Sequence, residues 1–173
     1  MRRLITALGL SFAYLIAPAP MAQAQAGGMS VRTDTPSGYP VPRFVSLKND
    51  ETFCRAGPSF DHPVAITYLK AGTPLLVVAE TTDHWRKVRD ADGAECWAHQ
   101  MTLRAPNHVI VLEETALFAQ RDRDSQVKAR LAPRVMARME RSDEGWAKLS
   151  ADGLSGWAET ARLWGAGHIA AQD

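Results

Sequence analysis

The feature of this chain that most constrains its fold is an internal repeat. The segment WRKVRDADGAECWAHQMTLR (85–104) resembles WAKLSADGLSGWAETARLW (146–164) once a one-residue gap is allowed. Each segment begins with a tryptophan, continues through Ala-Asp-Gly and reaches a second tryptophan that is followed by alanine. Self-similarity of this kind indicates a supersecondary unit that occurs more than once in the chain.

Segments upstream extend the repeat. FVSLKNDETFC (44–54) aligns without a gap with HVIVLEETALF (108–118), and LLVVAETTDHW aligns in the same way with MARMERSDEGW. The chain is therefore predicted to hold two units of about 60 residues each, 43–104 and 107–165.

Both units are predicted to consist of short strands. The first contains RFVSLK, TFCR, VAITYL, PLLVVAE, WRKVRD and ECWAH, which are rich in β-branched and aromatic residues and are separated by turn formers. An Asp-Gly pair between two such runs is a strong hairpin signal, and it occurs in both units. Residues 127–141 also have apolar residues at helical spacing, but Pro133 would break a helix there. Because the repeat aligns part of this stretch with a strand, we predict strands.

The strand pattern predicts an all-β fold of two small closed β-barrels in tandem, because closing a sheet removes its exposed edges. The stretch FCRAGPSFDHPVAITYLKAGTPLLVVAETTDHWRKVRDADGAECWAHQMTL resembles a bacterial SH3-like domain. That family typically runs from an NVRSGPS-type segment through an LKKGTKV strand to a GW-x-KV…DGxxGWVH-x-x-x-L ending. The second unit keeps this ending but has FAQRDRDSQ in place of the opening, so it resembles a degenerate copy. The resemblance implies two tandem SH3-like barrels.

Two cysteines, Cys54 and Cys96, stand where the SH3-like pattern has an apolar residue and a glycine. The gapless alignment places Phe118 and Gly156 at these positions in the second unit, so we expect a ring over a glycine to replace the cystine there. An even number of cysteines in an exported chain favours a disulfide bond. Catalysis by a thiol, or a metal site that uses Cys96 and His99, are the alternatives. The first lacks an activating base and the second lacks further ligands.

The N-terminus has the pattern of a secretory signal peptide, predicted over residues 1–26. Arg2 and Arg3 precede an uncharged apolar stretch, and small residues follow at the spacing of a cleavage site. A membrane anchor is the alternative, but the apolar stretch is shorter than the roughly 20 residues that span a bilayer. Residues 27–42 are rich in Gly, Ser and Pro and are expected to form a flexible linker. Residues 166–173 are expected to form a tail.

Export would place the protein in the periplasm or outside the cell. Cleavage removes two of the 20 Lys and Arg residues and leaves 18 against 19 Asp and Glu, a net charge of −1. Nucleic-acid binding is not expected, because clustered positive charge supplies most of the affinity for nucleic acids. We also expect no membrane insertion after cleavage, because no later segment is apolar enough to cross a bilayer.

Aromatic residues are the candidate ligand contacts. Trp97 and Trp157 are expected to fill the two barrels, because large rings dominate small cores. Trp85 and Trp146 follow the loop before the hairpin, where a half-exposed ring could form a groove for a peptide or a glycan. The candidate ligand-binding residues are Trp85, Tyr68, Phe60 and Trp146, with Trp164 as a further aromatic candidate.

The sequence shows no motif for catalysis, for a metal or for a cofactor. Its histidines have no regular spacing, and it lacks HExxH, a nucleophile elbow and a glycine-rich phosphate loop. We therefore expect a non-enzymatic protein with no cofactor, no catalytic residues and no metal ligands. The SH3-like resemblance implies a binding role, commonly toward cell-wall peptide or glycan. The alternative is an adaptor that binds and regulates another envelope protein.

Overall fold

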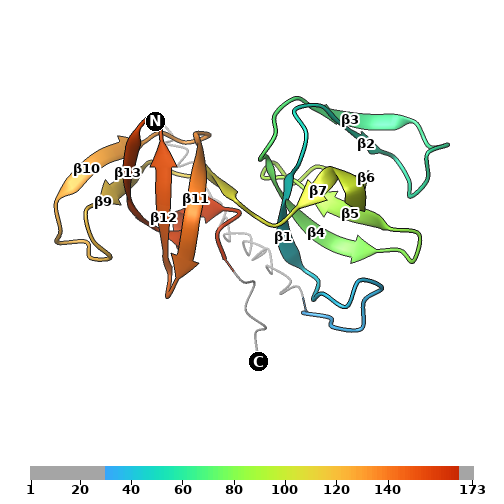
Figure 1. Cartoon of the computed structure of the whole chain (residues 1–173), viewed down its shortest axis with the longest axis horizontal. Helices are drawn as coiled ribbons and strands as arrows, with labels where there is room; N and C mark the ends of the chain where they lie inside the picture. The colour runs from blue at the N-terminus through green and yellow to red at the C-terminus, as the bar shows by residue number, and fades with distance from the viewer. Residues whose placement is uncertain (1–29, 168–173) are drawn as a thin grey trace, which may run out of the picture.

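The computed structural model describes residues 30–167, which form two seven-stranded antiparallel sheets that lie side by side (Figure 1). The strand order is β3-β2-β6-β5-β4-β1-β7 in the first sheet and β10-β9-β13-β12-β11-β8-β14 in the second. The two orders are the same topology, so the predicted all-β fold with two repeated units is confirmed. The predicted signal peptide, 1–26, and residues 168–173 lie outside the described residues.

We call the sheet of β1–β7 the first barrel and the sheet of β8–β14 the second barrel. In the hydrogen-bonded order, β3 and β7 are the terminal strands of the first barrel, and β10 and β14 are those of the second. The first barrel contains β1 (Arg43–Leu47), β2 (Thr52–Arg55), β3 (Val64–Tyr68), β4 (Pro74–Glu80), β5 (Trp85–Arg89), β6 (Glu95–His99), the 3₁₀ helix η1 (Gln100–Thr102) and β7 (Leu103–Arg104). The second contains β8 (His108–Val111), β9 (Thr115–Phe118), β10 (Val127–Leu131), β11 (Met136–Asp143), β12 (Trp146–Ala151), β13 (Leu154–Glu159), the 3₁₀ helix η2 (Thr160–Arg162) and β14 (Leu163–Trp164).

The two Asp-Gly pairs form the hairpin turns that the sequence predicts, between β5 and β6 and between β12 and β13. Gly93 and Gly153 have φ values of 85° and 80°, which glycine adopts without the steric cost that a side chain would add. The strands β10 and β11 confirm the strand prediction for residues 127–141, with Pro133 in the turn between them.

Each barrel has its own core. It is formed by the inward-facing residues, which are every second residue along a strand. In β6, for example, Cys96 and Ala98 are buried while Trp97 between them is on the other face. The first core contains Val41, Val45, Leu47, Cys54, Leu75, Val77, Val88, Cys96 and Ala98. The second contains Val109, Val111, Leu117, Leu131, Ala137, Ala147, Leu149, Ala158, Leu163 and Ala166.

The predicted disulfide between Cys54 and Cys96 is confirmed. Its S–S distance is 2.04 Å and the two Cα atoms are 5.6 Å apart, so the bond joins the neighbouring strands β2 and β6 inside the first core. Both sulfurs are consumed by this bond, and among residues 30–167 no cysteine is free. The alternatives that required a thiolate at Cys96 therefore have no thiolate to use.

The counterpart of Cys54 in the second barrel is Leu117, which corrects the expectation of Phe118. Arg55 pairs with Trp97 in the first barrel and Phe118 pairs with Trp157 in the second, so Phe118 matches Arg55. The loop between β8 and β9 is one residue shorter than the loop between β1 and β2. A shift of one residue moves every side chain of a strand to the opposite face, and the gapless alignment ignored that shift.

Residues 30–42 pack on the first barrel, although their composition favours a flexible linker. Arg32 and Val41 form an isolated antiparallel bridge with two backbone hydrogen bonds of 2.7 and 2.9 Å. Val41 is 1% exposed and belongs to the first core. We call residues 30–42 the N-terminal arm. Burial of one apolar side chain and pairing of the backbone hold the arm against the sheet.

The two barrels contact each other through β1 and the start of β4 on one side and β8 and β14 on the other. Trp164 Nε1 donates a hydrogen bond of 3.1 Å to the carbonyl oxygen of Pro74. Its ring meets Phe44 edge-to-face, with centroids 5.1 Å apart. Between the barrels, the backbone N–H of Asn107 donates to the Ser46 hydroxyl at 3.2 Å. Trp164 is thus part of the contact between the barrels.

Candidate functional site

Three rings gather on the outside of the first barrel and form what we call the aromatic surface: Phe60, Trp85 and His99. The centroid of Phe60 is 4.9 Å from that of Trp85 and 5.5 Å from that of His99, and Trp85 and His99 are 5.4 Å apart. Phe60 is 66% exposed, whereas Trp85 beneath it is only 4% exposed. An exposed ring is therefore held in place from below by two others.

The position of each ring follows from the local chain. Trp85 opens β5, and because Arg86 and Val88 face inward, Trp85 faces outward. Phe60 lies in the loop between β2 and β3, and this loop carries it over Trp85. Trp85 is therefore buried outside the core, by the loop and not by the barrel interior.

The loop that carries Phe60 is held by its own residues. The Arg55 guanidinium donates a 2.7 Å hydrogen bond to the His62 carbonyl oxygen and lies 5.7 Å from the centroid of the Phe60 ring. Gly57 is required where the His62 ring crosses the backbone, because an added Cβ would be 2.1 Å from the imidazole Cδ2. These contacts orient Phe60 before any ligand arrives.

Two of the four candidate ligand contacts lie away from this surface. Tyr68 ends β3 and packs against the first core, where its hydroxyl donates to Asp90 Oδ2 at 3.2 Å and lies 3.8 Å from Cys96 Sγ. Burial and the charge of Asp90 raise the pKa of Tyr68. Trp146 belongs to the second barrel and meets Phe118 edge-to-face at 5.8 Å. Only Phe60 and Trp85 of the four are brought together.

Trp97 and Trp157 face out of their barrels, which corrects the expectation that they fill the cores. Strand alternation decides this, since the inward positions of β6 are held by Cys96 and Ala98. Trp157 is only 8% exposed because the guanidinium groups of Arg121 and Arg141 cover its ring at 5.3 and 4.7 Å. Such cation–π contacts shield a ring without placing it in a core.

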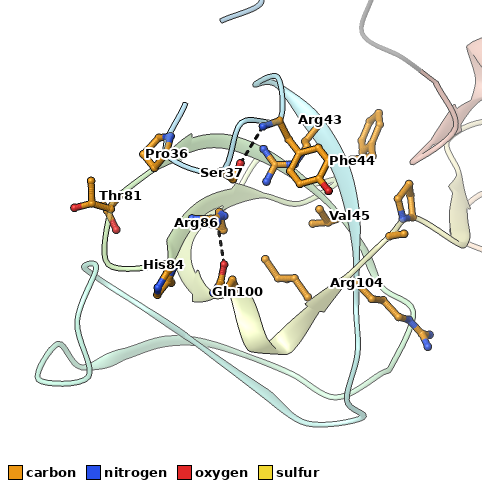
Figure 2. A pocket seen from close by; sticks show the side chains of 15 residues that line it. Pro36, Ser37, Arg43, Phe44, Val45, Thr81, His84, Arg86, Gln100 and Arg104 are labelled. Carbon is orange, nitrogen blue, oxygen red and sulfur yellow. Dashed lines mark hydrogen bonds between the residues drawn. The ribbon is translucent and has the colours of Figure 1, made fainter. Parts of the chain in front are cut away.

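A pocket of about 670 Å³ lies beside the loop that joins β4 and β5 (Figure 2). The N-terminal arm forms one wall of the pocket, the loop forms another, and the segment that follows η1 forms a third. We call it the arginine pocket, because three of its lining residues are arginines and none is acidic. The lining residues are Pro36, Ser37, Tyr39, Arg43, Phe44, Val45, Thr81, Thr82, His84, Arg86, Gln100, Leu103, Arg104, Ala105 and Pro106.

A buried ion cluster lies beside this pocket. The side chain of Glu80 is 1% exposed and pairs with Arg43 and, at 3.0 Å, with Arg86 Nε. Burial raises the pKa of Glu80, but hydrogen bonds from the Ser37 N–H and from Arg43, with the two positive charges, outweigh it and lower the pKa overall. The Arg86 side chain is 6% exposed, and burial lowers its pKa. It remains cationic, since a guanidinium is not deprotonated in proteins.

The arginine pocket was not anticipated from the sequence. Arg86 stands between Trp85 and Lys87 and looks like part of a solvated run. Side-chain alternation could have identified Arg86 as an inward-facing residue. Arg86 and Val88 are two positions apart and share a face of β5, and Val88 is an obvious core residue. Nothing in the sequence pairs Arg86 with Gln100, whose side-chain oxygen accepts a 3.1 Å hydrogen bond from Arg86 Nη2 (Figure 2).

Within residues 30–167 there is no group of three or more His, Cys, Asp or Glu side chains that could hold a metal ion. The same stretch of chain has no helix long and apolar enough to cross a membrane.

Comparison with known proteins places both barrels in one family. The bacterial SH3 domain family matches residues 48–105 and again residues 112–165. No curated protein sequence matches the chain. Two solved structures from Trichomonas vaginalis, NlpC2 and NlpC1, are similar at 11% identity and a TM-score of 0.32, with 72% and 78% of this chain covered. This chain spans 48% of each of those structures.

Proposed function

Because this chain belongs to the bacterial SH3 domain family, we propose that it is an exported, non-enzymatic protein that binds cell-wall peptide or glycan through the aromatic surface. The observation that carries this proposal is Phe60, which is 66% exposed and yet packed on Trp85 and His99. Binding energy at protein surfaces concentrates on such aromatic residues, because their area is large and little conformational entropy is lost when they bind.

Two observations support export. The sequence begins with the pattern of a signal peptide, and the Cys54–Cys96 bond belongs to the class of crosslink that persists in oxidising compartments. The first barrel also gains stability from this bond at a size where a single core is thin. A protein that works in the envelope, without cytoplasmic chaperones, benefits from this added stability.

Retention on purified peptidoglycan tests the wall proposal. The exported protein is expected to sediment with peptidoglycan and to remain bound in moderate salt, because ring contacts depend little on ionic strength. The Phe60→Ala variant is expected to lose about 1–2 kcal/mol of binding free energy, about a tenfold rise in Kd. Retention of the wild-type protein at the level of a protein that does not bind walls would overturn the proposal.

The matched control is Phe53→Ala in the same barrel. Phe53 is 50% exposed on β2 and has no ring contact among residues 30–167. It should bind like the wild type, and equal losses from both variants would show that the aromatic surface has no special role. Trp85→Ala is less informative, because Trp85 is 4% exposed and its removal also leaves Phe60 without support.

Two further outcomes bear on the proposal. If the wild-type protein does not bind walls but captures an envelope protein in a Phe60-dependent way, the aromatic surface serves a protein partner instead. Incubation of the purified protein with muropeptides should release no new product. A product that the protein forms catalytically would contradict the non-enzymatic part of the proposal.

A further inference from the structure

We propose that the arginine pocket binds the free C-terminal carboxylate of a short peptide. The proposal goes beyond the binding role of the aromatic surface and does not depend on it. None of the three rings of the aromatic surface lines the pocket. The two sites are neighbours, because His84 lines the pocket and its ring meets that of His99 edge-to-face with centroids 6.5 Å apart.

The charge of the pocket selects an anion. Arg43 and Arg86 contribute two positive charges, and Glu80 compensates only one of them. No acidic side chain lines the pocket, so one buried positive charge is left in excess. Arg104 also lines the pocket, but its exposed side chain extends away from Arg43 and Arg86 (Figure 2), so it adds little positive charge to the pocket. Positive charge that is shielded from water attracts an anion more strongly than the same charge on an open surface.

The guanidinium group of Arg86 is held in place by protein groups. Its Nε pairs with Glu80, its Nη1 donates to the Trp85 carbonyl oxygen at 3.2 Å, and its Nη2 donates to Gln100 Oε1 at 3.1 Å. A guanidinium carries five N–H donors, so these three bonds fix its orientation and do not exhaust its capacity. Guanidinium groups bind carboxylates through parallel hydrogen bonds, and a single excess charge matches a carboxylate better than a phosphate monoester dianion.

The remaining walls suit the body of a peptide. Tyr39 and Pro36 of the N-terminal arm face apolar residues of β1 and of the segment after η1 across the pocket, and Ser37 and Thr81 add polar groups. Pockets of several hundred Å³ with apolar walls and a few convergent polar groups are typical ligand sites. A volume of about 670 Å³ is far more than one ion needs and accommodates two or three small residues.

Calorimetry on the exported protein with three probes tests the proposal. The probes are N-acetyl-Ala-Ala as the free acid, the same peptide as its C-terminal amide, and inorganic phosphate. The free acid is expected to bind, and the amide to bind at least about tenfold more weakly, because it loses a charge-assisted hydrogen bond. Phosphate is expected not to displace the free acid at equal concentration.

Two variants locate the binding in the arginine pocket. Arg104→Gln removes a charge whose side chain extends away from the pocket (Figure 2), and it is expected to leave binding of the acid unchanged. Ala105→Trp keeps every charge but places a large ring at the exposed edge of the pocket, and it is expected to abolish binding. Both residues are exposed, so both variants should unfold at the wild-type temperature. Arg130→Gln, at an exposed arginine of the second barrel, is the matched control and should bind normally.

Three results would overturn the proposal. The first is equal affinity for the acid and the amide, and the second is displacement of the acid by phosphate. The third is unchanged affinity in Ala105→Trp. None of these depends on peptidoglycan, and Phe60→Ala should leave binding of the acid intact. Failure of the carboxylate site can therefore be told apart from failure of wall binding.

Discussion

The two barrels have the same strand order and differ in how equivalent positions are filled. Where the first barrel joins β2 and β6 through Cys54 and Cys96, the second has Leu117 against Gly156. The ideal Cβ of an alanine at Gly156 would be 2.9 Å from Leu117 Cβ. A bulky aliphatic side chain over bare backbone thus occupies the space of the cystine. The comparison shows that one packing problem has a covalent and a noncovalent solution in the same chain.

A second pair of equivalent positions differs in charge. Glu80 pairs across the ladder with Arg86, and the matching pair in the second barrel is Ser142 with Ala147. The second barrel therefore lacks counterparts of Glu80 and Arg86, which are two of the three members of the ion cluster beside the arginine pocket. Breaking a buried ion pair is costly, and such a cluster stabilises less than an apolar core of the same volume. The ion cluster is present in only one of the two barrels, which fits a binding role confined to that barrel.

The largest effect is expected from Glu80→Gln, which removes the negative charge between Arg43 and Arg86. The free energy of unfolding of the first barrel should fall by about 3–5 kcal/mol, because two guanidinium groups are left close together and poorly solvated. Urea unfolding followed by tryptophan fluorescence measures the change. Ser142→Ala in the second barrel should change stability by less than about 0.5 kcal/mol, since Ser142 is exposed. Equal changes in the free energy of unfolding at both positions would mean that the ion cluster does not depend on the charge of Glu80 for its stability.

The disulfide is expected to have the next largest effect. Cys54→Ser with Cys96→Ser should lower the unfolding free energy of the first barrel by about 2–4 kcal/mol, because the unfolded chain gains the entropy of an open loop. A reducing agent should have the same effect on the wild-type protein and none on the double variant. If alkylation finds both thiols free in the folded protein under oxidising conditions, the account of the first core is wrong.

The smallest effect is expected at Gly156, where the second barrel has bare backbone under Leu117 in place of the cystine. Gly156→Ala is expected to destabilise the second barrel by about 1–3 kcal/mol, although alanine in a strand normally costs nothing relative to glycine. The added methyl would meet the Leu117 side chain and the Phe118 carbonyl oxygen, both at 2.9 Å. Gly153→Ala is unsuited as a control because φ is positive there, so Ala158→Gly serves as the comparison for strand composition. Stabilisation by Gly156→Ala, measured by thermal unfolding, would refute the packing of Leu117 on bare backbone.

Much of this molecule could be predicted from the sequence because the signals are local. Each Asp-Gly turn is contained in two residues, and the strands on either side follow from side-chain alternation over a few positions. The disulfide was predicted from an even number of cysteines in a chain whose N-terminus has the pattern of an export signal. The outward position of Trp97 could also have been predicted by alternation, because Cys96 beside it faces the core.

Two results needed the tertiary structure. The match of Leu117 with Cys54 depends on a loop that is one residue shorter, and the gapless alignment did not allow for it. The arginine pocket depends on residues as far apart as Pro36 and Pro106, which meet only when the N-terminal arm packs on the barrel. No pattern in the sequence brings those segments together.

By itself, then, the sequence determined the repeat, the strand-forming segments, the hairpin turns and the crosslink, because each depends on neighbours along the chain. The tertiary structure decided which face of a strand each aromatic ring occupies, how the barrels contact each other through Trp164 and Pro74, and where positive charge gathers in a pocket. These depend on loop lengths and on packing between distant segments. Such contacts join residues that are far apart in the sequence, so a pattern of neighbouring residues does not predict them.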